Sequence, residues 1–214
     1  MTFLFLFVAF VISLLVTLIM TPLAKKIAIK YEIVDRPDER KIHTAKTPYL
    51  GGIAIFGGVM ATYFLFWPDH EHQIAIIIGA AIMLVTGLLD DKYNLKPVVK
   101  LLGQFASATV IVASGLLIEK INIPLFGEVH LDNLSVIVTV IWIIGVANAI
   151  NLIDGLDGLA AGVTTIALLS ISVMAILDAN YVVAFLCIII IGSNLGFLVH
   201  NFYPAKIYMG DAGS

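Results

Sequence analysis

The sequence has 214 residues, of which 60% are hydrophobic and only 13% are charged, and its formal net charge is −3. Soluble domains are about half apolar and about a quarter charged, so this composition excludes an ordinary soluble protein, as does the mean hydropathy of +1.04. The apolar runs are continuous rather than alternating. They therefore exclude a membrane β-barrel and predict an all-α, polytopic bundle of transmembrane helices.

The apolar runs predict about seven spans, which form one integral membrane domain over residues 1–214. The spans are residues 3–22, 51–67, 74–89, 97–118, 135–150, 159–177 and 181–199. No positive charge precedes the first run, whereas Lys25, Lys26 and Lys30 follow it. This order is typical of a retained membrane helix with its N-terminus outside, not of a cleaved signal peptide.

Seven spans place the connections alternately on two sides of the membrane. Residues 23–50, 90–96, 151–158 and 200–214 share the first side, and 68–73, 119–134 and 178–180 share the second. Of the 12 Lys and Arg residues, 11 fall on the first side or at its edge, and only Lys120 falls on the second. The positive-inside rule therefore assigns the first side to the cytoplasm. The 119–134 connection is expected to form a short hairpin without chemistry of its own.

A polar segment, Asn-Ala-Ile-Asn-Leu-Ile-Asp-Gly-Leu-Asp-Gly at 148–158, separates two apolar runs. Asn148, Asn151, Asp154 and Asp157 recur every third residue, a spacing that gathers side chains on one side of a helical turn. Carboxylates and amides between membrane helices are costly unless they bind a ligand or face water. The segment therefore predicts a functional site, and an ordinary polar loop is the alternative.

A second acidic group, Asp90 and Asp91, ends the apolar run 74–89, and Lys92, Lys96 and Lys100 follow it. Acids that orient Mg²⁺ and lysines that neutralise phosphate suit a metal–diphosphate site. The alternative is an ordinary charged end of a membrane helix.

Two further cytoplasmic connections contain candidate site residues. In 200–214, Asp211 lies between Gly210 and Gly213, a setting in which a carboxylate can approach a metal. Tyr208 either stacks on a base or is a simple aromatic anchor at the membrane interface. In 23–50, basic residues such as Lys46 either attract anionic head groups or contact a phosphate.

Together these motifs resemble the polyprenyl-phosphate N-acetylhexosamine-1-phosphate transferases (glycosyltransferase family 4). This membrane family includes phospho-MurNAc-pentapeptide translocase and the undecaprenyl-phosphate GlcNAc-1-phosphate transferases. The matching pieces are His43, residues 47–52, 87–91, 100–104, 148–158 and 201–214, in family order. The short 90–100 connection and residues 48–52 look more like the GlcNAc-1-phosphate branch. Family members continue past the position of Ser214, so the chain is expected to be the N-terminal part of a longer family domain.

The resemblance implies transfer of GlcNAc-1-phosphate from UDP-GlcNAc to undecaprenyl phosphate, with release of UMP. This is the first membrane step in making teichoic acid, lipopolysaccharide or a similar cell-envelope polymer. It implies Mg²⁺ as cofactor, with Mn²⁺ as an alternative, and a site on the cytoplasmic face of a bacterial plasma membrane. No nucleic-acid partner is expected, and the oligomeric state is left open, a homodimer included.

The resemblance also assigns roles to residues. Asp211 matches a metal ligand, and Asp90 and Asp91 match a catalytic acidic pair near the lipid phosphate and the metal. Substrate-binding positions are matched by Lys46, Lys100, Asn151, Asp154, Asp157, Asn201 and Tyr208. Among these, Tyr208 matches a residue that stacks on uracil and Lys100 a lysine near the diphosphate. Lys46 matches only approximately, because its spacing to Thr47 and Pro48 is one residue shorter.

Three other functions are alternatives to this one. A CDP-alcohol phosphotransferase needs an Arg shortly after its first Asp-Gly pair, and no Arg occurs after Arg40. An ion-coupled transporter would place acids near the middle of its spans, so convergence of Asp90, Asp154 and Asp211 at one face would argue against it. An inactive fragment of the transferase is the third alternative.

Overall fold

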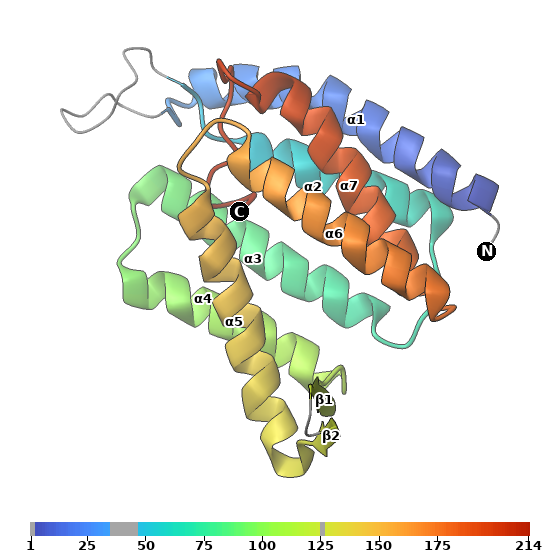
Figure 1. The fold of residues 1–214 in the computed structure, drawn as a ribbon. Coiled ribbons are helices and arrows are strands. Elements are labelled where there is room, and N and C mark those ends of the chain that lie inside the picture. Colours follow the sequence, from blue (N-terminus) through green and yellow to red (C-terminus); the bar gives the residue numbers. More distant parts are fainter. Residues whose placement is uncertain (1–2, 35–46, 125–126) are drawn as a thin grey trace.

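The computed structural model describes residues 3–34, 47–124 and 127–214, which form a helical bundle with one small hairpin (Figure 1). The helices are α1 (Phe3–Lys30), α2 (Gly51–Phe66), α3 (Gln73–Tyr93), α4 (Pro97–Ala113), α5 (Ser135–Ile153), α6 (Leu159–Leu177) and α7 (Tyr181–Asn201). Strands β1 (Lys120–Ile123) and β2 (Gly127–His130) pair antiparallel, and a 3₁₀ turn, η1 (Asp132–Leu134), leads into α5. The predicted helical class and the expected hairpin are both confirmed.

Five of these helices, namely α1, α3, α5 with its preceding turn, α6 and α7, are long and apolar enough to cross a membrane. Helices α2 and α4 are apolar but shorter, at 16 and 17 residues. Large apolar side chains such as Phe7, Trp142 and Leu177 point outward and are exposed. Such a surface is expected where lipid is the solvent, because apolar side chains can face the hydrocarbon. Only the backbone polar groups must be hydrogen-bonded inside the protein. The chain is therefore a multi-pass membrane protein.

Helix α7 is the most buried candidate span and packs against α1, α2 and α6. The Ser193 hydroxyl donates to the Ile55 carbonyl oxygen over 2.8 Å and bonds the Thr17 hydroxyl over 2.7 Å. A Cβ added at Gly196 would collide with the backbone of Leu14 in α1. Small residues and hydroxyl groups thus bring these helices together, as is usual inside a membrane.

Helices α3, α4 and α5 extend from this group on the side away from α1 (Figure 1). Helix α3 pairs with α4, where the Ser107 hydroxyl donates to the Gly79 carbonyl oxygen over 2.8 Å. Helix α5 is supported mainly by α4, and only Ser135 and Thr139 of its 19 residues are buried. Its position therefore depends on a small number of contacts.

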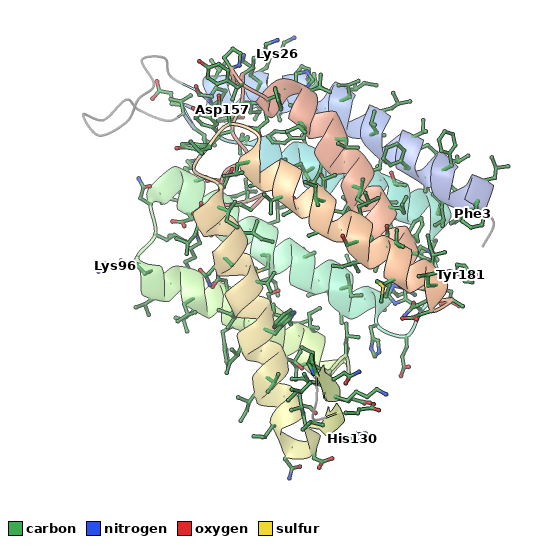
Figure 2. The ribbon with its side chains drawn as sticks, in the orientation of Figure 1. Phe3, Lys26, Lys96, His130, Asp157 and Tyr181 are labelled. Carbon is green, nitrogen blue, oxygen red and sulfur yellow. The ribbon has the colours of Figure 1, made fainter. Side chains whose placement is uncertain are left out.

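Several labelled side chains divide between the two ends of the bundle. Lys26, Lys96 and Asp157 lie toward one end, whereas Phe3, His130 and Tyr181 lie toward the other (Figure 2). The ends of two helices differ from the prediction, because α3 continues to Tyr93 and α5 to Ile153. Asp90, Asp91 and Asn151 are therefore held on helices and not in flexible connections.

Candidate active site

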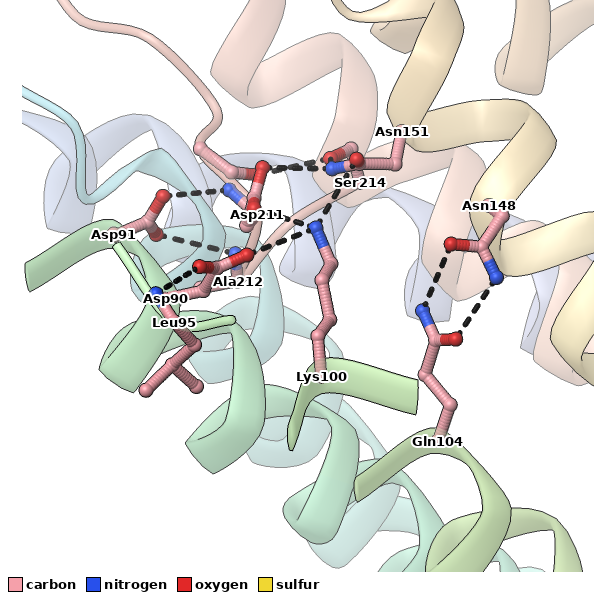
Figure 3. Close-up of polar contacts among 11 residues, drawn as sticks. Asp90, Asp91, Leu95, Lys100, Gln104, Asn148, Asn151, Asp211, Ala212 and Ser214 are labelled. Atoms are coloured by element: carbon pink, nitrogen blue, oxygen red, sulfur yellow. Dashed lines mark hydrogen bonds and ion pairs between the residues drawn. The ribbon is translucent and has the colours of Figure 1, made fainter. Parts of the chain in front are cut away.

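Lys100 lies at the centre of a polar cluster that joins α3, α4, α5 and the segment after α7 (Figure 3). Its Nζ is 3.0 Å from Asp90 Oδ2 and 2.5 Å from Asp211 Oδ2. The same ammonium donates to Asn151 Oδ1 over 3.1 Å. One cation therefore bridges two carboxylates that come from distant parts of the sequence.

Asp91 faces the backbone of the C-terminal segment instead of Lys100. Its carboxylate accepts hydrogen bonds from the Asp211 N–H over 2.8 Å and the Ala212 N–H over 3.2 Å. Gly210 adopts φ +73°, and a Cβ there would lie 2.7 Å from Asp91 Oδ2, so the turn requires glycine. Asp91 therefore holds Asp211 in place, in addition to the catalytic role that the sequence predicts for it.

Two helical glycines let residues 208–213 approach α2 and α3 closely. A Cβ at Gly87 of α3 would collide with the backbone of Asp211 and Ala212, and one at Gly52 of α2 with Ala212 and Gly213. At the start of α2, the Gly52 N–H donates to the Met209 carbonyl oxygen over 2.8 Å. The segment that carries Asp211 is therefore fixed between two helices.

Asn151 uses its amide to connect α5 to that segment. Its Nδ2 donates to Asp211 Oδ1 over 2.7 Å and to the Ser214 hydroxyl over 2.9 Å. Sequence reasoning did not single out Ser214, because a serine in a glycine-rich segment has no distinguishing pattern. It also did not anticipate that Gln104 and Asn148 would pair across α4 and α5.

Asp154 and Asp157 follow α5 and behave differently from each other. Burial raises the pKa of Asp154 to about 7, and the negative charges of Asp211 and Asp91 add to this effect. Asp154 is therefore electrostatically part of the cluster. Asp157 is bonded to the segment after α7, where its Oδ2 accepts a hydrogen bond from the Ala205 N–H over 2.9 Å.

Of the remaining predicted substrate-binding residues, Asn201 and Tyr208 have other partners, and Lys46 is not described. Asn201 is only 3% exposed, and its amide accepts from the Gly158 N–H over 3.1 Å and donates to the Ile207 carbonyl oxygen over 3.0 Å. Tyr208 lies beside Tyr49, with ring centroids 5.6 Å apart. Lys46 lies outside the described residues.

A cavity of about 210 Å³ opens onto the cluster. Lys100, Asn151 and Asp211 line one part of it, and Phe56 and Leu84 are among the apolar residues of another part. Charged and apolar walls in one cavity suit a ligand that has both a polar and an apolar portion.

The acids of the cluster suit a hard divalent cation. Burial pushes the pKa of Asp211 up, but hydrogen bonding with Asp90, Lys100 and Asn151 outweighs it and holds the pKa below its ordinary value. In the described part of the chain, no three His, Cys, Asp or Glu side chains gather in a metal-binding group. Mg²⁺ commonly uses one or two carboxylates and completes its shell with water and phosphate oxygens, so Asp90 and Asp211 fit such an ion.

The fold and this cluster define a multi-pass membrane protein with a charged site at one end of its bundle. Residues 73–214 match glycosyl transferase family 4, and the chain belongs to this family.

Three relatives illustrate the range of similarity. A probable undecaprenyl-phosphate N-acetylglucosaminyl 1-phosphate transferase of Bacillus subtilis is 47% identical over 97% of this chain and 58% of its own length. A decaprenyl-phosphate N-acetylglucosaminephosphotransferase of Mycobacterium leprae is 36% identical over 94% of this chain and 55% of its own. A phospho-N-acetylmuramoyl-pentapeptide-transferase of Streptococcus uberis is 37% identical over 83% and 58%. The chain thus spans little more than half the length of these relatives.

Proposed function

We propose that this protein transfers GlcNAc-1-phosphate from UDP-GlcNAc to undecaprenyl phosphate and releases UMP. The observation that carries the proposal is the meeting of Asp90, Lys100, Asn151 and Asp211 at one end of the bundle. A relative with 47% identity is named for this reaction. The transporter alternative loses support, because Asp90, Asp154 and Asp211 converge on one cluster.

The reaction is a displacement at the phosphorus that bears GlcNAc. An oxygen of the lipid phosphate forms a new bond to this phosphorus, while the bond from it to the oxygen bridging to UMP breaks. The electron pair leaves with UMP. Lys100 stabilises the negative charge that spreads over the phosphate oxygens, and Asn151 orients Asp211 toward it. An aspartate of the cluster either deprotonates the lipid phosphate or orients it.

The donor set supports a Mg²⁺ ion held by Asp211 and Asp90, and Mn²⁺ accepts the same oxygen ligands. When bound, the ion would neutralise the diphosphate of the donor. Removal of divalent cations by a chelator is therefore expected to abolish UMP release, and added Mg²⁺ to restore it.

The proposed orientation of the protein in the membrane follows from the distribution of positive charge in the sequence. Seven spans with the N-terminus outside would put the cluster on the cytoplasmic face of a bacterial plasma membrane, where UDP-GlcNAc is available. The product would be the first lipid-linked intermediate of an envelope polysaccharide or teichoic acid, and the protein acts as a single domain, alone or as a homodimer.

The direct test is UMP release from UDP-GlcNAc by purified protein in detergent, with undecaprenyl phosphate and Mg²⁺. The protein should include any residues that follow Ser214 in its gene. Lys100→Gln and Asp211→Asn are each expected to lower kcat about 100-fold or more. Lys96→Gln is the matched control, because Lys96 is exposed and lies outside the cluster.

Failure of the folded wild-type protein to release UMP would refute the proposal for these substrates. A covalent phospho-enzyme formed with UDP-GlcNAc alone would instead replace direct attack by a two-step route through an aspartyl phosphate.

A further inference from the structure

A reciprocal amide pair lies one helical turn away from the proposed catalytic cluster. Gln104 follows Lys100 by four residues on α4, and Asn148 precedes Asn151 by three residues on α5. Gln104 Nε2 donates to Asn148 Oδ1 over 3.3 Å, and Asn148 Nδ2 donates to Gln104 Oε1 over 2.8 Å (Figure 3). The two amides therefore form a second polar connection, parallel to the one between Lys100 and Asn151.

Gln104 is buried and Asn148 is half-buried, so it is costly to leave the pair without its hydrogen bonds. Gln104 is only 4% exposed, and Asn148 Nδ2 also donates to the Ile144 carbonyl oxygen of its own helix over 2.8 Å. Neither amide bonds to Asp90, Asp91 or Asp211. A buried amide without a partner loses its hydration without compensation, so the two helices must stay in register for both side chains to remain satisfied.

Helix α5 has few other contacts that could set this register. Its first turns are fixed by Thr139, whose hydroxyl accepts a hydrogen bond from the Ile118 N–H over 2.9 Å. Its outer surface is open, with Trp142 and Leu152 exposed. Near the cluster, α5 is hydrogen-bonded to α4 through the Gln104–Asn148 pair and the Lys100–Asn151 bond.

We propose that the Gln104–Asn148 pair is a positioning device, which holds α5 against α4 so that Asn151 and Lys100 meet at Asp211. The catalytic part of this inference rests on the proposed transferase function. Without the pair, α5 would shift or rotate on α4, and Asn151 would leave the position from which it orients Asp211. A misplacement of about 1 Å at a reacting centre can lower the rate about 100-fold.

Activity measurements test the catalytic part of the proposal. Gln104→Leu and Asn148→Leu are each expected to lower kcat about 10- to 100-fold, with little change in KM for UDP-GlcNAc. The double variant should lose no more than either single variant, because either change already breaks the pair. The exchanged pair, Gln104→Asn with Asn148→Gln, keeps the combined side-chain length and should recover most of the activity.

A matched control separates positioning from general loss of stability. Asn194 of α7 is a buried amide that donates to the Thr164 hydroxyl of α6 over 3.0 Å, away from the cluster. Asn194→Leu is expected to lower the thermal midpoint as much as Gln104→Leu does, while kcat remains near that of the wild type. Equal kcat values in the two variants would overturn the proposal, as would an exchanged pair that recovers nothing.

A distance measurement tests the same proposal without any assay of activity. Spin labels at positions 101 of α4 and 152 of α5, in a Cys187→Ala background, report the separation of the two helices. Both sites are suitable because Leu101 is 49% and Leu152 84% exposed, and Cys187 is the only cysteine. Gln104→Leu should shift or broaden the distance distribution, and Asn194→Leu should not.

The activity measurements and the distance measurement together distinguish failure of this inference from failure of the proposed function. A wild-type protein that is inactive, with a distance that still changes in Gln104→Leu, would refute the transferase proposal and support the pair as the determinant of helix position. An unchanged distance would overturn the positioning role whatever the activity.

Discussion

Lys100 separates two carboxylates that would otherwise repel each other. Its ammonium lies within ion-pair distance of both Asp90 and Asp211. Because like charges in a partly buried site are unfavourable, Lys100→Met is expected to destabilise the protein by about 1–3 kcal/mol, a value reduced from that of a fully buried pair. Thermal unfolding in detergent measures this loss.

The same variant tests the proposed metal site. Mg²⁺ should raise the unfolding midpoint of Lys100→Met more than that of the wild type, because a divalent cation can replace the missing ammonium between the acids. If Mg²⁺ fails to raise the unfolding midpoint of Lys100→Met, with the matched Lys96→Met measured in parallel, a metal between Asp90 and Asp211 would be contradicted.

Asp154 makes stability depend on pH in the direction opposite to that of a salt-bridged acid. Burial raises its pKa from an ordinary value of 3.8 to about 7, so the folded protein disfavours the charged form. The unfavourable contribution is absent below pH 3.8, grows as the pH rises toward 7, and is complete above that. Asp154→Asn is therefore expected to raise the unfolding midpoint at pH 8 by about 2–4 °C and to change it little at pH 4.

Metal-free protein is needed for the Asp154 experiment, because a bound cation would favour the carboxylate. Asp178→Asn, in an exposed turn after α6, is the matched control. A gain for Asp154→Asn that is as large at pH 4 as at pH 8 would rule out the titration of Asp154 as its cause.

At the level of elements, the contact between α3 and the C-terminal segment depends on the absence of a side chain at one position. Gly87→Ala would place a methyl group against the backbone of Asp211 and Ala212, and such overpacking typically costs about 1–3 kcal/mol. Asp211 would also move, so the variant should lose activity as well as stability.

Gly145→Ala on α5, unlike Gly87→Ala, is expected to cause no loss of stability. No atom lies within 4 Å of a Cβ added at Gly145, and alanine is favoured over glycine in a helix by about 0.5–1 kcal/mol. This variant should be at least as stable as the wild type in the same unfolding assay. Similar losses in both variants would show that the close approach at Gly87 is not what holds the segment.

The sequence was sufficient to predict the elements but not their packing. Continuous apolar runs located the helices, because lipid-exposed segments must be apolar over their full length. Their polar ends were placed less well: Asp90, Asp91 and Asn151 were assigned to connections, although helical hydrogen bonding continues through them. Hydropathy alone cannot locate a helix end that is stabilised by tertiary contacts.

The candidate site, like the fold, could be predicted from the sequence only in part. The assignment of their segments to one side of the membrane and the family resemblance predicted that Asp90, Lys100, Asn151 and Asp211 would share a site, and the structure brings them together. The backbone hydrogen bonds of Asp91 were not predictable, because they depend on how closely glycine-containing helices approach a distant segment. The packing of a buried amide such as Gln104 is likewise decided by a partner on another helix.

For the whole molecule, the orientation in the membrane remains a prediction from the positive-inside rule. Single cysteines at positions 96 and 120, in a Cys187→Ala background, would be labelled with a membrane-impermeant maleimide in intact cells. Position 120 is expected to react directly and position 96 only after the cells are permeabilised. The reverse pattern would place the polar cluster on the outer face and contradict the proposed use of cytoplasmic UDP-GlcNAc.

The placement of Asp91 against residues 211 and 212 has a consequence for biosynthesis. A polypeptide is made from its N-terminus, so Asp90 and Lys100 can pair as soon as the α3–α4 hairpin has entered the membrane. Asp91 has to wait until more than a hundred further residues have been translated, because its hydrogen-bond donors are the backbone N–H groups of Asp211 and Ala212. During that interval a partly assembled chain keeps an acidic group at the membrane boundary without its final partners. Arrival of the segment that contains Asp211 and Ala212 then supplies these partners, so Asp91 reports whether this part of the fold has formed.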